Sequence, residues 1–90
     1  MYGLKRSEIE QIKAKLEKIG IKNPILFGSR AKGSHKRGSD VDLAVIGDEK
    51  RANYVLNEET NMPYFFDVVN IKKIKNRNLL EHIQRVGKIL

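Results

Sequence analysis

Two aspartates, Asp40 and Asp42, open an apolar stretch that ends at Ile46. Successive side chains of a strand point to opposite faces, so a strand here places both carboxylates on one face. Two carboxylates this close repel each other unless one is protonated or a cation lies between them. Mg²⁺ is the natural cation, because it takes hard oxygen ligands and commonly combines one or two carboxylates with substrate phosphates. The pair therefore predicts a central strand that begins with a metal site.

A sharp turn precedes this strand in the chain. Residues 25–27 form a short apolar strand behind Asn23-Pro24, which favours an extended entry. Gly28 then allows a close approach of the backbone to a ligand. Ser29 supplies a hydroxyl and starts a short helix, whose first N–H groups can face an anion. We expect this turn to bind a phosphate. A Gly-Ser pair taken alone more often forms an ordinary strand-to-helix turn without a ligand.

A third acid lies in a later strand. Residues 64–71 are mostly aromatic and β-branched, and Asp67 is the single acid among them. An unpaired carboxylate is expensive to bury in such a strand, so Asp67 lies at the open end or has a partner. If this strand neighbours the one that begins at Asp40, the partner is the cation held by Asp40 and Asp42. An exposed position at the sheet edge is the alternative.

Apolar residues at helical spacing predict two clear helices and a weak one. The first starts at Ser7, with Glu10 completing a capping box, and it ends at Gly20. The remaining expected elements are a short helix within Glu49–Glu59, a loop over Asn57–Pro63, a helix from about Asn78 to Gly87 and an extended tail at Lys88–Leu90.

The composition predicts a single small domain over residues 1–90. With 18 Lys and Arg against 11 Asp and Glu, the net charge is +7, which suits an acidic partner such as a nucleotide or RNA, or a solvated lysine-rich surface. The lack of Cys excludes disulfides and thiolate metal sites. No apolar run reaches the ~18 residues that span a bilayer, and the N-terminus has no signal-peptide pattern. We expect a cytoplasmic protein without membrane contact.

The motif formed by Gly28-Ser29, Gly33, Asp40-x-Asp42 and Asp67 resembles that of the polymerase-beta-like nucleotidyltransferases. More narrowly, the chain resembles the minimal nucleotidyltransferase (MNT) antitoxins that are paired with HEPN toxins. The resemblance covers nearly the whole chain, and every motif position is filled. It implies an α+β fold with a mixed sheet of three to four strands flanked by helices, without the second, substrate-binding domain of larger relatives. Substrate choice must then come from a partner protein or a dimer.

The resemblance also implies a reaction and roles for the site residues. The reaction is transfer of AMP from ATP to a protein hydroxyl, best matched by a tyrosine of a cognate HEPN toxin. Two Mg²⁺ ions would serve it, as in other two-metal transfers. The implied nucleotide-binding residues are Gly28, Ser29 and Arg30, the last through its positive charge. The implied catalytic and metal-binding residues are Asp40, Asp42 and Asp67, with Asp67 beside the acceptor hydroxyl.

Other functions stay open at this point. The same fold without catalysis would neutralise a toxin by contact alone. Nucleotidyl transfer to RNA or a small molecule is a weaker alternative, because aromatic residues for base stacking are few. The segment Arg77–His82 resembles the Arg-x4-His ribonuclease motif of HEPN proteins, but a chain with so few helices does not build that composite site.

A partner protein or a second copy of the chain would need apolar surface for docking. The candidates are Tyr64, Phe65 and the closing Ile89-Leu90. The alternative is that these residues close the core of the domain itself.

Overall fold

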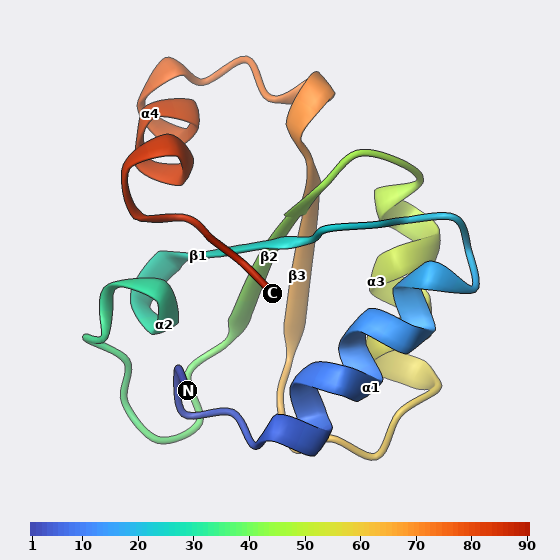
Figure 1. The fold of residues 1–90 in the computed structure, drawn as a ribbon. Helices are drawn as coiled ribbons and strands as arrows, with labels where there is room; N and C mark the ends of the chain where they lie inside the picture. Colours follow the sequence, from blue (N-terminus) through green and yellow to red (C-terminus); the bar gives the residue numbers. More distant parts are fainter.

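Four strands form one sheet at the centre of the molecule, in the order β3-β2-β1-β4, and helices cover both of its faces (Figure 1). The computed structural model describes residues 1–90. The elements are α1 (Arg6–Glu17), β1 (Ile25–Phe27), α2 (Gly28–Lys32), β2 (Val41–Val45), α3 (Glu49–Glu58), β3 (Phe66–Asn70), a 3₁₀ turn (Ile71–Lys73), α4 (Arg77–Val86) and β4 (Lys88–Ile89). The predicted α+β class with a mixed sheet is confirmed. None of the helices has the length and apolar character needed to span a bilayer.

The strand pairing decides which residues meet. β2 and β3 are parallel, whereas β1 is antiparallel to both β2 and β4. Asp42 lies opposite Asp67 across the parallel pair. On the other side of β2, Phe27 at the end of β1 also lies opposite Asp42. The strand of Asp67 therefore neighbours the strand of Asp42, which was the condition for a cation shared by the acids, and the turn at Gly28 follows directly beside them.

The larger core lies between the sheet and the helices α1 and α3, on the right in Figure 1. The strand residues that it buries alternate along the sheet: Leu26, Val41, Leu43, Val45, Phe66 and Val68. Ile12 and Leu16 of α1, with Ala52 and Leu56 of α3, complete this core. Because strand side chains alternate between faces, Asp42 and Asp67 point to the opposite face of the sheet.

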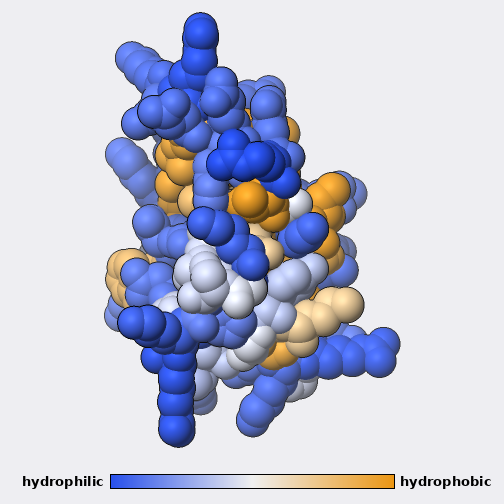
Figure 2. All heavy atoms as spheres, turned by 90° about the vertical axis from the view of Figure 1, so that its left-hand side faces the viewer, coloured by the Kyte–Doolittle hydropathy of each residue, from blue (hydrophilic) through white to orange (hydrophobic).

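That opposite face carries a smaller apolar cluster beneath α4. Its buried members are Phe27, Ala44 and Ile83, and Val69 packs against them. Ala44 lies two positions after Asp42 in β2, so both side chains point to this face. The apolar cluster occupies the part around Ala44, and Asp42 lies next to it along the strand. Figure 2 shows this side of the molecule, where hydrophilic side chains dominate and apolar side chains appear between them. The acids therefore lie on this face beyond the apolar cluster.

The first helix begins earlier than its sequence pattern predicts. Lys5 is the N-cap of α1, and the Glu8 carboxylate accepts a hydrogen bond from the Lys5 N–H at 2.8 Å. The capping box expected at Ser7 and Glu10 is therefore wrong by two residues. The same Glu8 oxygen also accepts a hydrogen bond from the Tyr64 hydroxyl at 2.8 Å, so the start of α1 is tied to a distant segment of the chain.

Other helix boundaries follow from local hydrogen bonds. The first helix ends at Glu17, three residues before the predicted Gly20, and Lys18 is its C-cap. Gly20 lies in the turn that follows: its φ is +80°, and the Ile21 N–H returns to the Leu16 carbonyl at 3.0 Å. The weakly predicted helix is α3, capped by Asp48. The last helix starts at Arg77, one residue earlier than expected, because the Asn76 side chain accepts a hydrogen bond from the Leu79 N–H at 3.2 Å.

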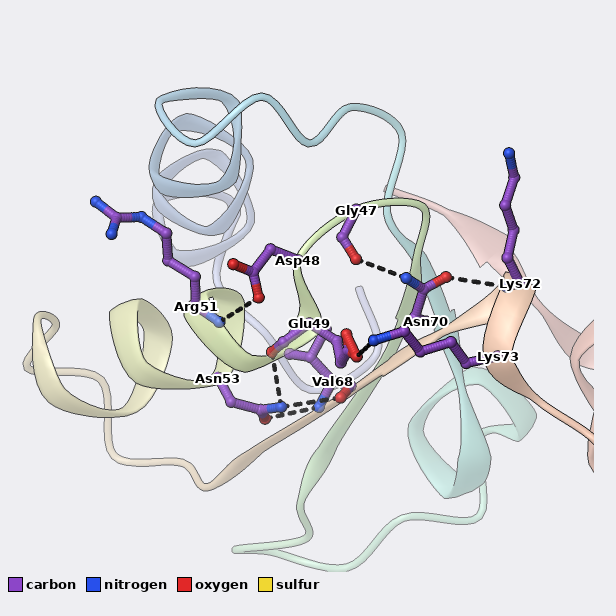
Figure 3. A network of polar contacts seen from close by, with 9 residues as sticks. All are labelled: Gly47, Asp48, Glu49, Arg51, Asn53, Val68, Asn70, Lys72 and Lys73. Carbon is purple, nitrogen blue, oxygen red and sulfur yellow. Dashed lines mark hydrogen bonds and ion pairs between the residues drawn. The ribbon is translucent and has the colours of Figure 1, made fainter.

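Two side chains of α3 pair with the outer edge of β3, the last strand of the sheet. The Asn53 amide donates to the Val68 carbonyl and accepts from the Val68 N–H, both at 2.9 Å (Figure 3). Asn57 makes the same two bonds with Phe66, both at 2.8 Å. These amides satisfy backbone groups that another strand would otherwise take, and so they cover an exposed edge. They also fix Asp67, which lies between the two bonded residues.

Replacing Asn53 by Ala should leave the N–H and carbonyl of Val68 without protein partners. Because unsatisfied buried polar groups are costly, we expect the free energy of unfolding to fall by about 1–3 kcal/mol. Urea denaturation followed by circular dichroism measures this change. Asn61→Ala, at an exposed position, is the matched control and should change the value by less than about 0.5 kcal/mol. Equal stability of the two variants would contradict the edge role of Asn53.

Candidate functional site

Three aspartates gather at the end of the sheet where β2 and β3 begin. The parallel register places Asp42 beside Asp67. Asp40 lies just before β2 and is close enough for its charge to act on Asp42. Asp42 is half-buried, whereas Asp40 and Asp67 are exposed. The structure thus brings together the three acids that the sequence singled out.

Asp42 has the most perturbed environment of the three. Burial raises the pKa of its carboxyl above the ordinary value, and the charges of Asp67 and then Asp40 raise this pKa further. A carboxyl in this position gains from a proton or from a neighbouring cation, since either removes the repulsion. Acids perturbed by burial and by specific neighbouring charges are typical of functional sites.

Gly28 lies directly against this carboxylate. Its φ is +75°, a conformation that L side chains rarely adopt, and a Cβ here would collide with Oδ2 of Asp42. Glycine is therefore required on two independent grounds. The close approach joins the turn to the acids, and Ser29, half-buried in α2, follows at once. The predicted phosphate turn and the predicted metal ligands form one continuous site.

The donor set suits Mg²⁺ in its chemistry, because carboxylate oxygens come from two adjacent strands. The acids do not form a finished ligand set: no three acidic or histidine side chains are grouped so that they could hold one ion. Mg²⁺ usually completes its shell with water and substrate phosphates. Asp40, Asp42 and Asp67 are therefore the residues that could hold it together with a nucleotide.

Arg30, which was predicted to assist nucleotide binding through its positive charge, makes its polar contacts within the protein. Its side chain is buried, Nε and Nη2 donate to the Ser39 carbonyl at 3.1 and 2.8 Å, and Nη1 donates to the Tyr2 carbonyl at 2.9 Å. The guanidinium also lies over the Tyr64 ring, 4.8 Å from its centroid. Because Ser39 immediately precedes Asp40, Arg30 holds the loop that leads into the first acid. The guanidinium charge is therefore paired with backbone carbonyls and the Tyr64 ring of the protein itself.

The largest cavity is not at the acids. It measures about 480 Å³ and lies beside the loop that connects α2 to β2. Its lining includes three cationic side chains, Arg30, Lys36 and Arg37, and none of the three aspartates contributes to it. The candidate site is therefore an open surface at the end of the sheet, which a second protein could cover.

His82 is a site residue that the sequence did not reveal. It lies on α4, and its Nε2 accepts a hydrogen bond from the Gly28 N–H at 3.1 Å. Its ring meets the edge of the Phe27 ring, with the centroids 6.0 Å apart. In the sequence this histidine attracted notice only as part of a ribonuclease-like motif. The contact depends on how α4 packs over β1, and no local pattern encodes that packing.

Comparison with known proteins agrees with the geometry. The sequence matches the family described as polymerase beta, nucleotidyltransferase over residues 10–90, which include the turn and all three acids. The chain therefore belongs to this nucleotidyltransferase family. Its fold is similar to that of a chain in a crystal structure of a toxin-antitoxin with AMP-PNP, with a TM-score of 0.71 and 21% identity over 96% of this chain and 72% of that chain. A comparison with curated proteins gave no match.

Asp42→Asn should stabilise the protein when metal is absent. The raised pKa of Asp42 means that its contribution to folding is complete below the unfolded pKa, about 3.9, and is lost as pH rises through the folded pKa. In EDTA at about pH 7 the variant should therefore melt at a higher temperature than wild type. The gap should shrink as pH falls through the raised folded-state pKa and should change no further below the unfolded pKa, about 3.9. Melting curves across this pH range provide the measurement.

Glu58→Gln, at an exposed position in α3, controls for the loss of one negative charge. It should leave the melting temperature almost unchanged across the same range. An Asp42→Asn variant that melts at or below the wild-type temperature throughout would show that repulsion at the site does not weaken the metal-free fold.

Proposed function

We propose that this chain transfers AMP from ATP, with Mg²⁺, to a hydroxyl of a partner protein, and that it is the antitoxin of a helical HEPN-type toxin. One observation carries the proposal: Asp42 and Asp67 are neighbours in parallel strands, and the glycine turn touches Asp42. Membership of the nucleotidyltransferase family supports the class of reaction. A tyrosine is the favoured acceptor, as in the MNT antitoxins that the sequence resembles.

The site residues have two proposed roles: some bind the nucleotide, and one faces the acceptor hydroxyl. Gly28 and Ser29 would receive the phosphates, and Asp42 with Asp40 would hold Mg²⁺ at the triphosphate. Asp67 is exposed across the parallel pair and would face the incoming hydroxyl. When bound, Mg²⁺ supplies charge neutralisation to an in-line displacement. The positions of these residues on two strands and one turn keep the two roles adjacent.

The transfer balances in a single displacement. The acceptor oxygen attacks the α-phosphorus of ATP and forms a new P–O bond. The bond from the α-phosphorus to the oxygen that bridges to the β-phosphate breaks, and pyrophosphate leaves with its electron pair. The proton of the hydroxyl passes to the Asp67 carboxylate, which acts as the general base and returns the proton to water. The products are an AMP-modified protein and pyrophosphate.

The partner is inferred from the structural neighbour and from the open site. That neighbour is a toxin-antitoxin crystal structure with AMP-PNP, an ATP analogue, which supports both a toxin partner and ATP. Of the apolar docking candidates, Phe65 is 60% exposed and Ile89 is 68% exposed. Tyr64 and Leu90 instead pack against the chain's own core. Phe65 directly precedes β3, so a protein docked there would approach the end of the sheet that bears Asp67.

Asp67→Asn separates catalysis from nucleotide binding. If Asp67 serves the acceptor, calorimetric affinity for Mg²⁺-ATP should stay within a few-fold of wild type. Transfer of ³²P-labelled AMP from α-labelled ATP onto a co-expressed HEPN-type partner should fall by about 10²–10⁴-fold. Asp42→Asn should instead weaken the nucleotide binding itself.

Glu59→Gln, at an exposed position outside the site, is the control and should behave as wild type in both assays. Normal transfer by Asp67→Asn would refute the acceptor role of this residue. Tight toxin binding without any transfer by the wild-type protein would favour the alternative function, neutralisation by contact alone. Labelling of RNA in place of the protein would favour a nucleic-acid acceptor.

A further inference from the structure

The roles proposed above make no use of His82, although it contacts the turn of the site. Its Nε2 lies 3.1 Å from the Gly28 nitrogen, which donates the hydrogen bond. The two residues are 54 positions apart in the chain, so the contact is purely tertiary. It joins α4 to the first residue of α2, on the same side of the sheet as the acids.

Gly28 is held between two side chains. The Asp42 carboxylate lies so close on one side that no Cβ would fit, and the His82 imidazole lies at its N–H. Because glycine has no side chain, its backbone groups are the only means of fixing its position. We infer that His82 is a positioning residue of the nucleotide site, which sets the place of the Gly28-Ser29 turn relative to Asp42. The inference rests on the proposed function, since it takes this turn to bind the nucleotide.

The chemistry of the contact defines the form of the imidazole. Nε2 can accept a hydrogen bond only when it carries no proton, so the ring is neutral with its proton on Nδ1. The ring is oriented by its edge contact with Phe27, at an interplanar angle of 81°. The next residue, Ile83, is buried in the cluster between α4 and the sheet. Packing of α4 is thereby linked to the geometry of the turn.

The hydrogen bond can be separated from simple packing by two substitutions. His82→Phe keeps a flat ring against Phe27 but removes the acceptor. His82→Gln loses the ring but offers a side-chain oxygen in place of Nε2. If packing alone matters, the Phe variant should match wild type and the Gln variant should be worse. If the acceptor matters, this order reverses.

The test is calorimetric titration of Mg²⁺-ATP into wild type, His82→Phe, His82→Gln and the exposed α4 control Gln84→Leu. We expect the dissociation constant to rise about threefold to tenfold in the Phe variant, the range of one hydrogen bond. The Gln variant should recover at least half of this loss on a logarithmic scale, and the control should match wild type. Thermal melts of each variant confirm that the titrated protein is folded.

Two results would overturn the inference while leaving the proposed function intact. In the first, wild type binds Mg²⁺-ATP and the Phe variant binds as well. In the second, the Gln variant is no better than the Phe variant. Failure of wild type to bind Mg²⁺-ATP would instead defeat the proposed function, and the inference with it.

A spectroscopic measurement on the wild-type protein does not depend on any variant folding. The ¹⁵N chemical shifts of the His82 imidazole at neutral pH should identify Nδ1 as protonated and Nε2 as the acceptor. Addition of Mg²⁺-ATP should shift the Gly28 amide and the His82 imidazole signals together. A proton on Nε2 would exclude the hydrogen bond and overturn the inference.

Discussion

The parallel pairing of β2 with β3 is the constraint on which the candidate site depends. It places Asp42 directly beside Asp67, on the face of the sheet opposite to the larger core. A shift of one residue in this register would turn one carboxylate toward the apolar side, where burial of an unpaired charge is prohibitive. The hydrophobic alternation that builds the core therefore also fixes the acids as neighbours. Fold and site are specified by the same pattern.

The remaining polar contacts hold the backbone around the acids and leave the acids themselves free. Asn53 and Asn57 secure the strand on either side of Asp67. Arg30 secures the loop before Asp40, and His82 secures the turn beside Asp42. The carboxylates keep their lone pairs for other ligands. Burial first, and then the charges of Asp67 and Asp40, raise the pKa of Asp42. Under the proposed function, a cation bound at these acids would relieve the repulsion among them and so stabilise the folded protein.

The sequence predicted what is encoded locally. The three sheet-forming runs, the glycine turn after α1 and the Gly-Ser turn all follow from patterns within a few residues. The sequence left open whether the two acid-bearing strands are neighbours, because the strand order is set by tertiary packing. The sequence did not predict the buried clamp of Arg30 or the contact of His82 with Gly28, because each joins segments that meet only through tertiary packing. It also misplaced the start of α1, where Glu8 is shared between the helix end and Tyr64. The roles of the site residues in metal and nucleotide binding remain predictions.

Paramagnetic broadening by Mn²⁺, a substitute for Mg²⁺, tests most directly whether the end of the sheet binds metal and nucleotide together. In ¹H–¹⁵N spectra with ATP present, small additions of Mn²⁺ should first broaden the amides of Gly28, Asp42 and Asp67. The amides of α1 and α3, on the far side of the sheet, should keep their intensity, and Asp42→Asn should remove the selective pattern. Broadening spread over the surface carboxylates, or the same pattern in the Asp42→Asn variant, would contradict a metal-nucleotide site at these acids.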